Sequence, residues 1–321
     1  MKAGISTEKG LEIRDIPQPA PQPNEILVRV RAAGLNRADL NAAFGKGGHG
    51  AMGAVIGLDW SGEVVETGKE VQGGFKPGDR VMCAGAGGYA EFAVVDWGRV
   101  VPMPNGMSFE DAATLPVAIA TMHDALITNG RMKKGDAVLI QGASAGVGLM
   151  GLQIAKLLGA RLVIGTSTNA GRRARLKEFG ADLAIDTTDP SWPDQVLKAT
   201  DGKGVDVIVD QVAGGVMNGN MKCAAILGRI VNVGRLGGTA GEFDYNLHAQ
   251  RRIAYIGVTH RTRSVDELRE ETRVMWRDLA DAVAAGKLRL PIDRTFPLAE
   301  AVAAQAHMKA NQHFGKILLI P

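Results

Sequence analysis

The chain has 321 residues, of which 45% are hydrophobic and 22% are charged, which is enough for two domains with substantial cores. Its formal net charge is only +3, and this argues against a dedicated nucleic-acid or polyanion binder. No apolar run approaches the roughly 20 residues of a membrane span, and the beginning lacks the apolar core of a signal peptide. Cys83 and Cys223 form no disulfide or metal-binding pattern. We therefore expect a soluble, cytoplasmic α/β protein.

Up to about residue 115 the sequence is typical of strands and turns. EILVRVRAAGL (25–35) alternates as a strand does, and SGEVVETG (61–68) and DRVMCAGAGGYAEFAVVD (79–96) are β-rich segments interrupted by glycine. This part is predicted to form a β-rich domain.

From about residue 117 strands alternate with helices. The predicted strands are DAVLIQGA (136–143), RLVIGTS (161–167), DLAIDT (182–187), GVDVIVDQV (204–212), GRIVNVG (228–234) and RRIAYIGV (251–258). The predicted helices between them are VGLMGLQIAKLLG (147–159), GRRARLKEFG (171–180), PDQVLKAT (193–200) and VMNGNMKCAAIL (216–227). This alternation predicts a parallel, doubly wound sheet. Helices at 264–286 and 297–311 and a strand at 315–320 should follow, and we expect this tail to return to the first domain.

Four glycines, Gly142, Gly146, Gly148 and Gly151, stand where the first strand of the parallel sheet ends and a helix begins. Glycine there permits a tight turn, close approach of backbone N–H groups to a pyrophosphate, and close packing of helix on strand. The helix N-terminus adds free donors and partial positive charge. The spacing GxxxGxG differs from GxGxxG, and a glycine-rich helix start that only packs tightly is the alternative. The strand–helix alternation that follows favours a dinucleotide site.

The end of the second strand of the parallel sheet predicts which nicotinamide cofactor is bound. NAD-binding proteins usually place Asp or Glu about 20 residues after the glycines to hold the ribose hydroxyl. No carboxylate occurs between Gly165 and Leu176; the segment instead offers Thr166, Ser167, Thr168, Arg172, Arg173 and Arg175. Hydroxyls and arginines suit a 2′-phosphate, so we expect NADPH, although one or two of the arginines could simply form a solvated helix face.

Several motifs in order resemble one protein family. They are AAGLNRADL (32–40), IGLDWSGEVVETG (56–68), KPGDRVM (76–82), GGYAEFAVV (87–95), AATLPVAIATMHDAL (112–126), the glycine stretch and ANQHFGKILL (310–319). Together they resemble the medium-chain dehydrogenase/reductase superfamily, in its zinc-free quinone oxidoreductase branch. The resemblance implies a GroES-like catalytic domain made of residues 1–116 and 262–321 around a Rossmann domain, residues 117–261.

The resemblance also bears on metal binding. Zinc-dependent relatives would have a cysteine at Asn36 and a His-Glu pair at Leu58–Asp59, which this sequence lacks. Its six histidines, among them His49, show no metal-ligand spacing. We therefore expect no metal, and direct hydride transfer from NADPH to a quinone or an α,β-unsaturated carbonyl compound.

The resemblance assigns roles to individual residues. Asn36 would lie beside the nicotinamide ribose and the substrate, where its amide could bind a ribose hydroxyl or a substrate carbonyl. The implied cofactor contacts are Ser144, Ala145, Gly146, Val147 and Gly148 at the pyrophosphate, Thr166, Ser167, Arg172 and Arg173 at the adenosine end, Val212 and Gly234 in the dinucleotide cleft, Thr259 near the nicotinamide, and Asn311. Asn36 and Asn311 could instead cap turns.

One departure from the family pattern concerns proton donation. Several relatives have a tyrosine shortly after the NRAD segment, where this sequence has Phe44. Reduction of an enone would then need water, Lys46 or His49 as the proton donor, whereas a reduced quinone can take protons from solvent. This difference slightly favours quinone-like acceptors.

Two other functions stay open. The same fold could reduce an enal, an enone or an enoyl thioester, and Arg261 and Arg263 could then contribute to a basic entrance for a CoA ester. The chain could also be a cofactor-binding protein with little turnover, as a crystallin or RNA-binding relative would be; the modest net charge argues against RNA as the main ligand. Members of the branch commonly dimerise through the last Rossmann strand, so the resemblance implies a homodimer through residues 251–258.

Overall fold

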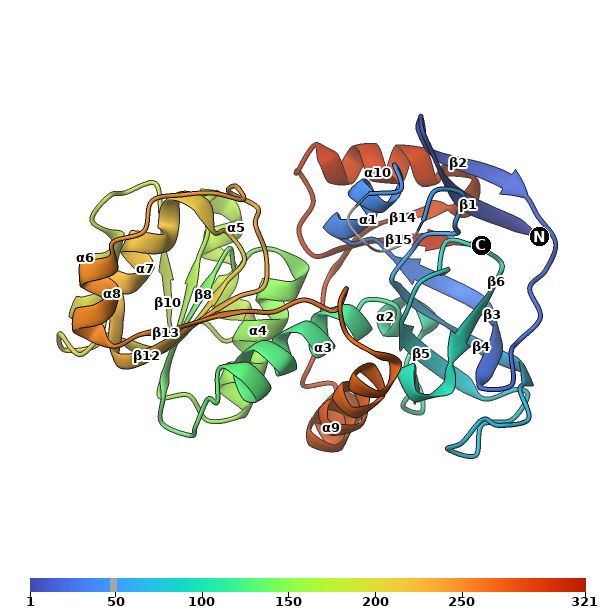
Figure 1. Ribbon diagram of the computed structural model, residues 1–321, viewed down its shortest axis with the longest axis horizontal. Coiled ribbons are helices and arrows are strands. Elements are labelled where there is room, and N and C mark those ends of the chain that lie inside the picture. Colours follow the sequence, from blue (N-terminus) through green and yellow to red (C-terminus); the bar gives the residue numbers. More distant parts are fainter. Residues whose placement is uncertain (47–50) are drawn as a thin grey trace. The chain divides into compact units, whose positions relative to one another are not determined.

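The computed structural model describes residues 1–46 and 51–321. They form two compact units, Met1–Ala120 with His260–Pro321 and Thr121–Thr259 (Figure 1). In these described ranges no helix combines the length and the apolar character that crossing a membrane requires.

The first unit contains an antiparallel-rich sheet whose strands run in the order β14-β15-β3-β4-β5-β7, with β6 also paired to β3. The strands of this sheet are β3 (Glu25–Gly34), β4 (Asp59–Thr67), β5 (Arg80–Ala84), β6 (Phe92–Asp96), β7 (Val100–Pro102), β14 (Ile292–Pro297) and β15 (Lys316–Ile320). A separate two-stranded sheet is formed by β1 (Lys2–Thr7) and β2 (Gly10–Asp15). The helices of this unit are α1 (Arg37–Ala42), α2 (Phe109–Ala112), the first part of α3 (Pro116–His123), α9 (Val265–Ala284) and α10 (Ala301–Lys309).

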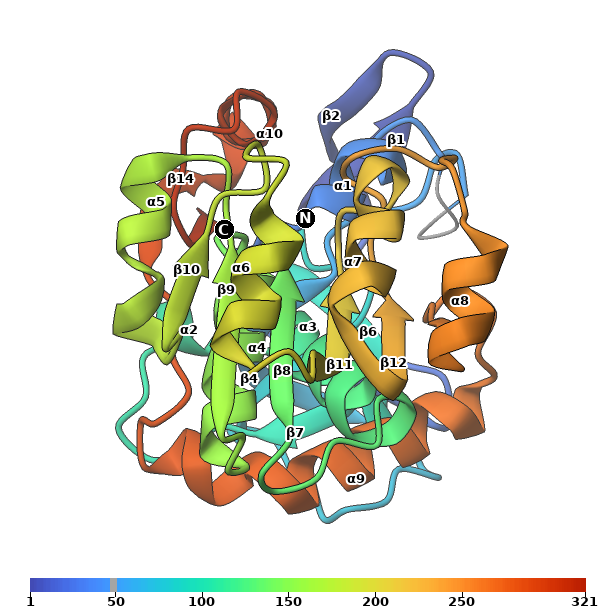
Figure 2. The same ribbon diagram turned by 90° about the vertical axis from the view of Figure 1, so that its left-hand side faces the viewer.

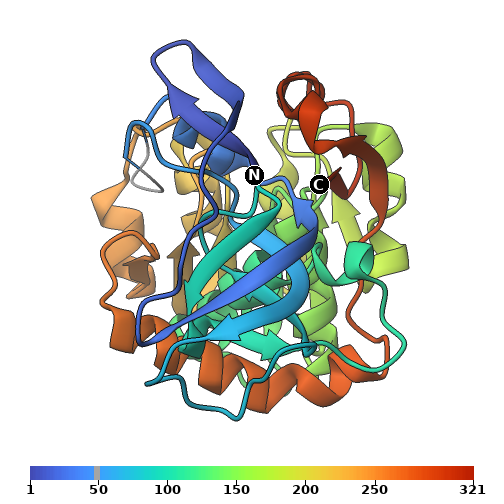
Figure 3. The same ribbon diagram turned by 90° about the vertical axis from the view of Figure 1, so that its right-hand side faces the viewer.

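The C-terminal strand of the chain completes this sheet. β15 pairs antiparallel with β3, where Leu318 lies opposite Gly34, and parallel with β14 (Figure 3). β3 forms where the alternating sequence predicted a strand, and most of its residues are buried. Ile26, Val28 and Trp60 belong to the core of this unit. Residues far apart in the sequence are therefore held side by side by sheet pairing.

The second unit is a six-stranded sheet in the order β10-β9-β8-β11-β12-β13, and every pairing in it is parallel. Its strands are β8 (Ala137–Gln141), β9 (Leu162–Thr166), β10 (Leu183–Ile185), β11 (Val205–Asp210), β12 (Ala224–Asn232) and β13 (Ala254–Gly257). Its helices are α4 (Gly146–Leu157), α5 (Ala170–Ala174), α6 (Trp192–Ala199), α7 (Met217–Cys223) and α8 (Tyr245–Arg251), with a π-helical turn at Asp124–Asn129. The predicted doubly wound parallel sheet is confirmed.

Helices α6 and α7 cover one face of the parallel sheet (Figure 2). Trp192 and Val196 from α6 and Met221 from α7 pack there in one core cluster with strand residues such as Ile164 and Ile208. The middle residues of the strands are mainly apolar because both faces of a parallel sheet are covered. This packing fixes the carboxyl ends of the strands, the edge at which ligands of such sheets bind.

One predicted helix is too long. The sequence pattern indicated a helix over 216–227, but α7 ends at Cys223 and Ala224–Leu227 are the first residues of β12. Ala224 has extended backbone angles and pairs with Val205 of β11, and Leu227 has a positive φ of 62°. Pairing with β11 therefore overrides the helical propensity of these apolar residues.

Candidate functional site

The glycine stretch forms a sharp turn between β8 and α4. Gly142 has a φ of 68°, in the left-handed region that favours glycine. A Cβ atom at Gly148 would lie 2.6 Å from the Cα of Ala143, so the first turn of α4 packs directly on the loop backbone. Ala145, which precedes α4, provides no side-chain cap, so the first N–H groups of this 12-residue helix remain available to an anion.

A buried set of polar side chains holds this turn in place through hydrogen bonds. We call Gln141, Thr166, Asp210, Gln211 and Asn220 the turn network. The hydroxyl of Thr166 accepts from the Gly142 backbone N–H at 3.0 Å and donates to Gln141 Oε1 at 2.7 Å. Gln141 Nε2 donates to Asn220 Oδ1 at 2.7 Å, and Asn220 Nδ2 donates to Asp210 Oδ2 at 3.2 Å. Gln211 Nε2 donates to the Gln141 carbonyl oxygen at 3.0 Å.

Asp210 ends β11 and organises the next loop. Its Oδ1 accepts from the backbone N–H groups of Val212 and Ala213 at 2.8 and 2.9 Å. Burial raises the pKa of this carboxyl, against the lowering effect of those two donors. Val212 thereby lies beside the turn, since a Cβ atom at Gly142 would be 3.3 Å from its Cγ2. Gly234 follows β12, and its backbone donates to the Asp210 carbonyl oxygen at 3.2 Å.

The structure gives the two hydroxyl residues after β9 different environments. Thr166 is 1% exposed, and its hydroxyl is occupied by the turn network. The Ser167 hydroxyl donates to Ser144 Oγ at 3.0 Å and accepts from the Asn169 backbone at 3.3 Å. Ser144 and Ser167 are thus brought together, and they join the glycine turn to the loop that begins α5.

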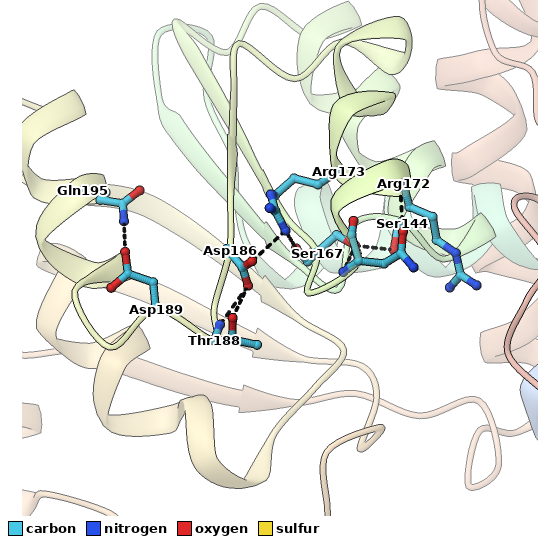
Figure 4. A network of polar contacts seen from close by, with 9 residues as sticks. Ser144, Ser167, Arg172, Arg173, Asp186, Thr188, Asp189 and Gln195 are labelled. Atoms are coloured by element: carbon cyan, nitrogen blue, oxygen red, sulfur yellow. Dashed lines mark hydrogen bonds and ion pairs between the residues drawn. The ribbon is translucent and has the colours of Figure 1, made fainter.

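The three arginines near α5 do not form one cluster. Arg173 makes an ion pair with Asp186 at 2.8 Å and donates to the Ser167 carbonyl oxygen at 2.8 Å. Arg175 makes an ion pair with Glu178 at 3.2 Å. Arg172 and Arg173 extend in opposite directions, with Arg173 toward Asp186 (Figure 4). Two donors from Thr188 are the main cause of the lowered pKa of Asp186, so this carboxyl is a stable anionic partner for Arg173.

The first unit holds a second buried polar group around Asn36, which we call the amide cluster: Asn36, Asp39, Asp59, Tyr89 and Lys316. Lys316 Nζ donates to Asp59 Oδ2 at 2.6 Å and to Asn36 Oδ1 at 3.0 Å. Asn36 Nδ2 donates to Asp59 Oδ2 at 2.9 Å. The other oxygen of Asp59 accepts from the Val117 backbone N–H at 2.7 Å. Lys316 is on β15, Asp59 begins β4 and Asn36 follows β3, so the sheet pairings converge on this point.

Asp39 and Tyr89 support the backbone of Asn36. Asp39 Oδ2 accepts from the Asn36 N–H and from the Tyr89 hydroxyl, both at 2.8 Å. Burial raises the pKa of Asp39 to about 7, against the lowering effect of these two donors. Its Oδ1 is buried without a hydrogen-bond partner. Burial and the neighbouring Asp39 raise the pKa of Tyr89 well above its ordinary value, so the tyrosine stays a donor.

The remaining predicted residues lie at the surface. Thr259 follows β13 and is exposed, as is Asn311, which has a φ of 55° and accepts from Arg37 through Oδ1 at 3.0 Å. Lys46 is also exposed. His49 lies outside the described residues.

Sequence reasoning missed several members of both groups. The turn network depends on Gln141, Asp210 and Asn220, and the amide cluster on Asp39, Tyr89 and Lys316. Two signals were present: Asp210 ends an otherwise apolar strand, and Lys316 is a lone cation in the apolar terminal strand. A charged residue in a buried strand requires a partner, but the sequence does not identify that partner.

Comparison with known proteins places the chain in a family. Residues 22–105 match the alcohol dehydrogenase GroES-like domain, and residues 146–280 match the zinc-binding dehydrogenase domain. A quinone oxidoreductase of Pseudomonas aeruginosa is 32% identical over 314 residues, which are 97% of this chain and 95% of that protein. The chain belongs to the medium-chain dehydrogenase/reductase superfamily, in its quinone oxidoreductase branch, and is an oxidoreductase of this nicotinamide-dependent family. The resemblance seen in the sequence motifs is confirmed.

Other relatives differ in the reaction or cofactor that their names state. A phenolphthiocerol/phthiocerol polyketide synthase chain of Mycobacterium tuberculosis is 32% identical over 96% of this chain, although the match covers only 14% of that protein. A solved NAD-dependent alcohol dehydrogenase is 30% identical with a TM-score of 0.88 and full coverage of both chains. A mycobacterial protein solved in complex with NADPH is 27% identical with a TM-score of 0.89, also with full coverage of both chains.

Proposed function

We propose that the protein is a zinc-free oxidoreductase that transfers a hydride from NADPH to quinones or similar electrophilic carbonyl compounds. The observation that carries this proposal is the glycine turn, where Gly142 and Gly148 bring bare backbone and the uncapped start of α4 to the carboxyl edge of the parallel sheet. Those N–H groups can bind a pyrophosphate. The bound cofactor supplies the hydride, while the protein binds and orients it.

The preference for NADPH rests on the loop after β9. Ser167 is tied to Ser144 of the glycine turn, and no carboxylate between Gly165 and Leu176 competes for a ribose 2′-phosphate. Arg173 holds the loop through Asp186, and we assign Arg172 as the arginine that binds the 2′-phosphate because its side chain extends away from Asp186 (Figure 4). The mycobacterial relative solved with NADPH supports the preference for NADPH, and the relative named as NAD-dependent is the reason to compare NADPH with NADH directly.

We propose that the reaction uses no zinc, because the residues of the amide cluster are poorly suited to bind it. Asp59 is the carboxylate bonded to the side-chain amide of Asn36, and both of its oxygens already accept hydrogen bonds, one from the Lys316 ammonium at 2.6 Å. A divalent cation would be repelled by that ammonium, and an amide is a poor substitute for the thiolate and imidazole ligands of zinc. The residues present around Asn36 therefore do not fit a catalytic zinc ion.

The first experiment measures NADPH consumption with a p-quinone and with a simple enone, with NADH and EDTA in parallel. We expect quinone-dependent oxidation that prefers NADPH and is unaffected by EDTA. Loss of activity in EDTA would contradict the zinc-free reaction. Tight binding of NADPH with no turnover of either acceptor would favour a cofactor-binding protein.

The role of Arg172 is tested by substitution. Arg172→Ala should lower the preference for NADPH over NADH, measured as a ratio of kcat/KM values, by on the order of 10-fold, because a charge-assisted bond to the phosphate is lost. Arg175→Ala is the matched control, since Arg175 directly follows α5 and is paired with Glu178, and it should leave the ratio unchanged. An equal effect of both substitutions would contradict the assignment.

We also infer a second candidate reaction, the reduction of an enoyl thioester. The match to a segment of a polyketide synthase over 96% of this chain supports it. This reaction must protonate carbon, and among the candidates Lys46 is exposed. A faster reaction with a crotonyl thioester than with a quinone would favour it.

We propose that the protein is a homodimer formed through β13. This strand is the last in the order of the sheet and pairs with β12. Tyr255 on it is 45% exposed, and an edge strand with exposed apolar groups is suited to pair with a second copy. Light scattering at micromolar concentration should report a dimer, and Tyr255→Lys should shift it toward monomer. A monomeric native protein would refute this assembly.

A further inference from the structure

One buried carboxylate, Asp210 at the end of β11, contacts two different parts of the second unit. Its Oδ1 accepts from the backbone N–H groups of Val212 and Ala213 at 2.8 and 2.9 Å, and its Oδ2 accepts from Asn220 Nδ2 at 3.2 Å. Ala213 has a φ of 58° and a ψ of −153°, a conformation that strains every residue except glycine. The loop at Val212 and Ala213 therefore needs an anchor, and Asp210 Oδ1 provides it.

The other oxygen of Asp210 begins a chain of side-chain hydrogen bonds that ends at the glycine turn. A carboxylate only accepts, so Asn220 turns its NH₂ group toward Asp210 and its oxygen toward Gln141. Gln141 then donates from Nε2 to Asn220 and accepts through Oε1 from the Thr166 hydroxyl. Because the only hydrogen of this hydroxyl goes to Gln141, the oxygen of Thr166 accepts from the Gly142 N–H, at 3.0 Å.

Reversing this chain would leave a buried hydrogen without its acceptor. With a neutral amide at position 210, an acceptor remains at one end only, so the side chain must either release the Val212 loop or donate to Asn220. In the second case both amides of the chain turn round, and Gln141 Nε2 donates to the Thr166 oxygen. The Thr166 hydrogen then loses its acceptor. The side chains along the chain, from Asp210 to Thr166, are at most 1% exposed, so water cannot replace a lost partner and the loss is costly.

We propose that Asp210 and Asn220 are positioning residues for the glycine turn, in which the charge of Asp210 sets the direction of the hydrogen-bond chain that holds the Gly142 N–H. Thr166, which was predicted to contact the adenosine end of the cofactor, uses its only hydrogen inside this chain. One anion then holds both the glycine turn and the Val212 loop. The inference rests on the proposed function, because this turn is the proposed site of the NADPH pyrophosphate.

Exchanging the charge between the two residues tests the chain. Asp210→Asn alone should weaken NADPH binding, measured by calorimetry, on the order of 10-fold, because a buried hydrogen bond is lost. Adding Asn220→Asp moves the charge by one residue and restores a donor opposite every acceptor, so the affinity should return to within about 3-fold of the wild type. A double variant that binds NADPH no better than Asp210→Asn would overturn the inference.

The matched control is Asp206→Asn, near the opposite end of the same strand. The Asp206 carboxylate also accepts from a backbone N–H, that of Ala137, at 2.8 Å. An asparagine oxygen can accept the same bond, so NADPH affinity should be unchanged. An effect as large as that of Asp210→Asn would contradict a special role of Asp210.

Hydrogen exchange of the Gly142 amide tests the chain without any ligand. This amide should exchange slowly in the wild type, on the order of 10-fold faster in Asp210→Asn, and slowly again in the double variant. The neighbouring Ala143 amide donates to the backbone oxygen of Thr166 at 2.8 Å, so its exchange rate should stay constant. Equal acceleration of both amides would indicate general loosening and would refute the chain.

A change at the far end of the chain covers the case in which Asp210→Asn does not fold. Thr166→Val nearly keeps the shape of the side chain but removes the acceptor for Gly142, and it should weaken NADPH binding on the order of 10-fold. Thr166→Ser keeps the hydroxyl and should bind within about 3-fold of the wild type. Wild-type affinity in Thr166→Val would contradict the inference. Failure of the proposed function is separable: if the wild type binds no NADPH, that function fails, and exchange of the Gly142 amide still decides whether the chain exists.

Discussion

The turn network and the amide cluster are both buried and polar, but they are built from different chemistry. In the turn network, amides, a hydroxyl and one carboxylate form neutral or charge-assisted bonds that end on the backbone of Gly142, Val212 and Ala213. In the amide cluster, the ion pair between Lys316 and Asp59 ends on a side chain, Asn36.

This difference follows from what each group must hold. A phosphate-binding turn presents backbone N–H groups, and their direction is fixed once the path of the chain is fixed. The side chains that hold such a turn can therefore be either hydrogen-bond donors or acceptors. An amide side chain ends in an oxygen, which accepts hydrogen bonds, and an NH₂ group of nearly the same shape, which donates them. Neighbours of opposite charge, such as Lys316 and Asp59, favour one placement of these two groups over the other.

The largest effect should come from breaking the ion pair on one side. Asp59→Asn leaves the Lys316 ammonium buried with no anionic partner, and the free energy of unfolding should fall by about 3–5 kcal/mol. Urea denaturation checks this value. The control is Glu12→Gln, which breaks the exposed pair between Arg14 and Glu12 at 2.7 Å and should leave the denaturation midpoint unchanged. Equal midpoint shifts in the two variants would show that the buried pair of Lys316 and Asp59 contributes no more to stability than the exposed pair of Arg14 and Glu12.

The next effect concerns the glycine turn between β8 and α4. A Cβ atom at Gly148 would lie 2.6 Å from the Cα of Ala143, so Gly148→Ala must displace the turn. Overpacking of this kind costs about 1–3 kcal/mol, and if the binding conformation of the turn bears this cost, NADPH affinity should fall by roughly 5- to 150-fold. Gly215→Ala, where a Cβ atom would meet nothing within 4 Å, is the control. Unchanged affinity in Gly148→Ala, measured by calorimetry, would show that the turn does not bind the cofactor.

The sequence predicted the glycine turn better than the amide cluster, for a physical reason. The glycines, the preceding strand and the following helix are contiguous, and local chain geometry determines the turn. The parallel sheet and the family were predicted from the same kind of local pattern and are confirmed. The boundary of α7 was wrong because pairing of Ala224 with Val205 is a tertiary contact.

The amide cluster could not be predicted in the same way. Lys316 and Asp59 are 257 positions apart in the sequence, and only the pairing of β15 with β3 and of β3 with β4 brings them together. Asn36 itself was singled out through the family resemblance, without any indication of its buried partners Asp59 and Lys316. Likewise, the distinction between Arg172 and Arg173 depends on Asp186, which lies beyond the helix that carries both arginines.

The last effect is gradual with pH and concerns the carboxyl of Asp39, which accepts from the backbone N–H of Asn36. Burial raises the pKa of Asp39 from 3.8 to about 7 in the folded protein, so between these values the folded state holds a proton that the unfolded state has released. The contribution of this group to stability therefore falls as pH rises from 4 to 7 and is level above that range, with a slope of at most about 1.4 kcal/mol per pH unit.

Asp39→Asn removes the titration, while its carbonyl oxygen can still accept from the Asn36 backbone and the Tyr89 hydroxyl. Urea denaturation at pH 5, 6, 7 and 8 should show the variant gaining stability relative to the wild type up to pH 7. Parallel pH profiles would mean that Asp39 is already ionised at pH 5, and that the amide cluster holds a second buried negative charge.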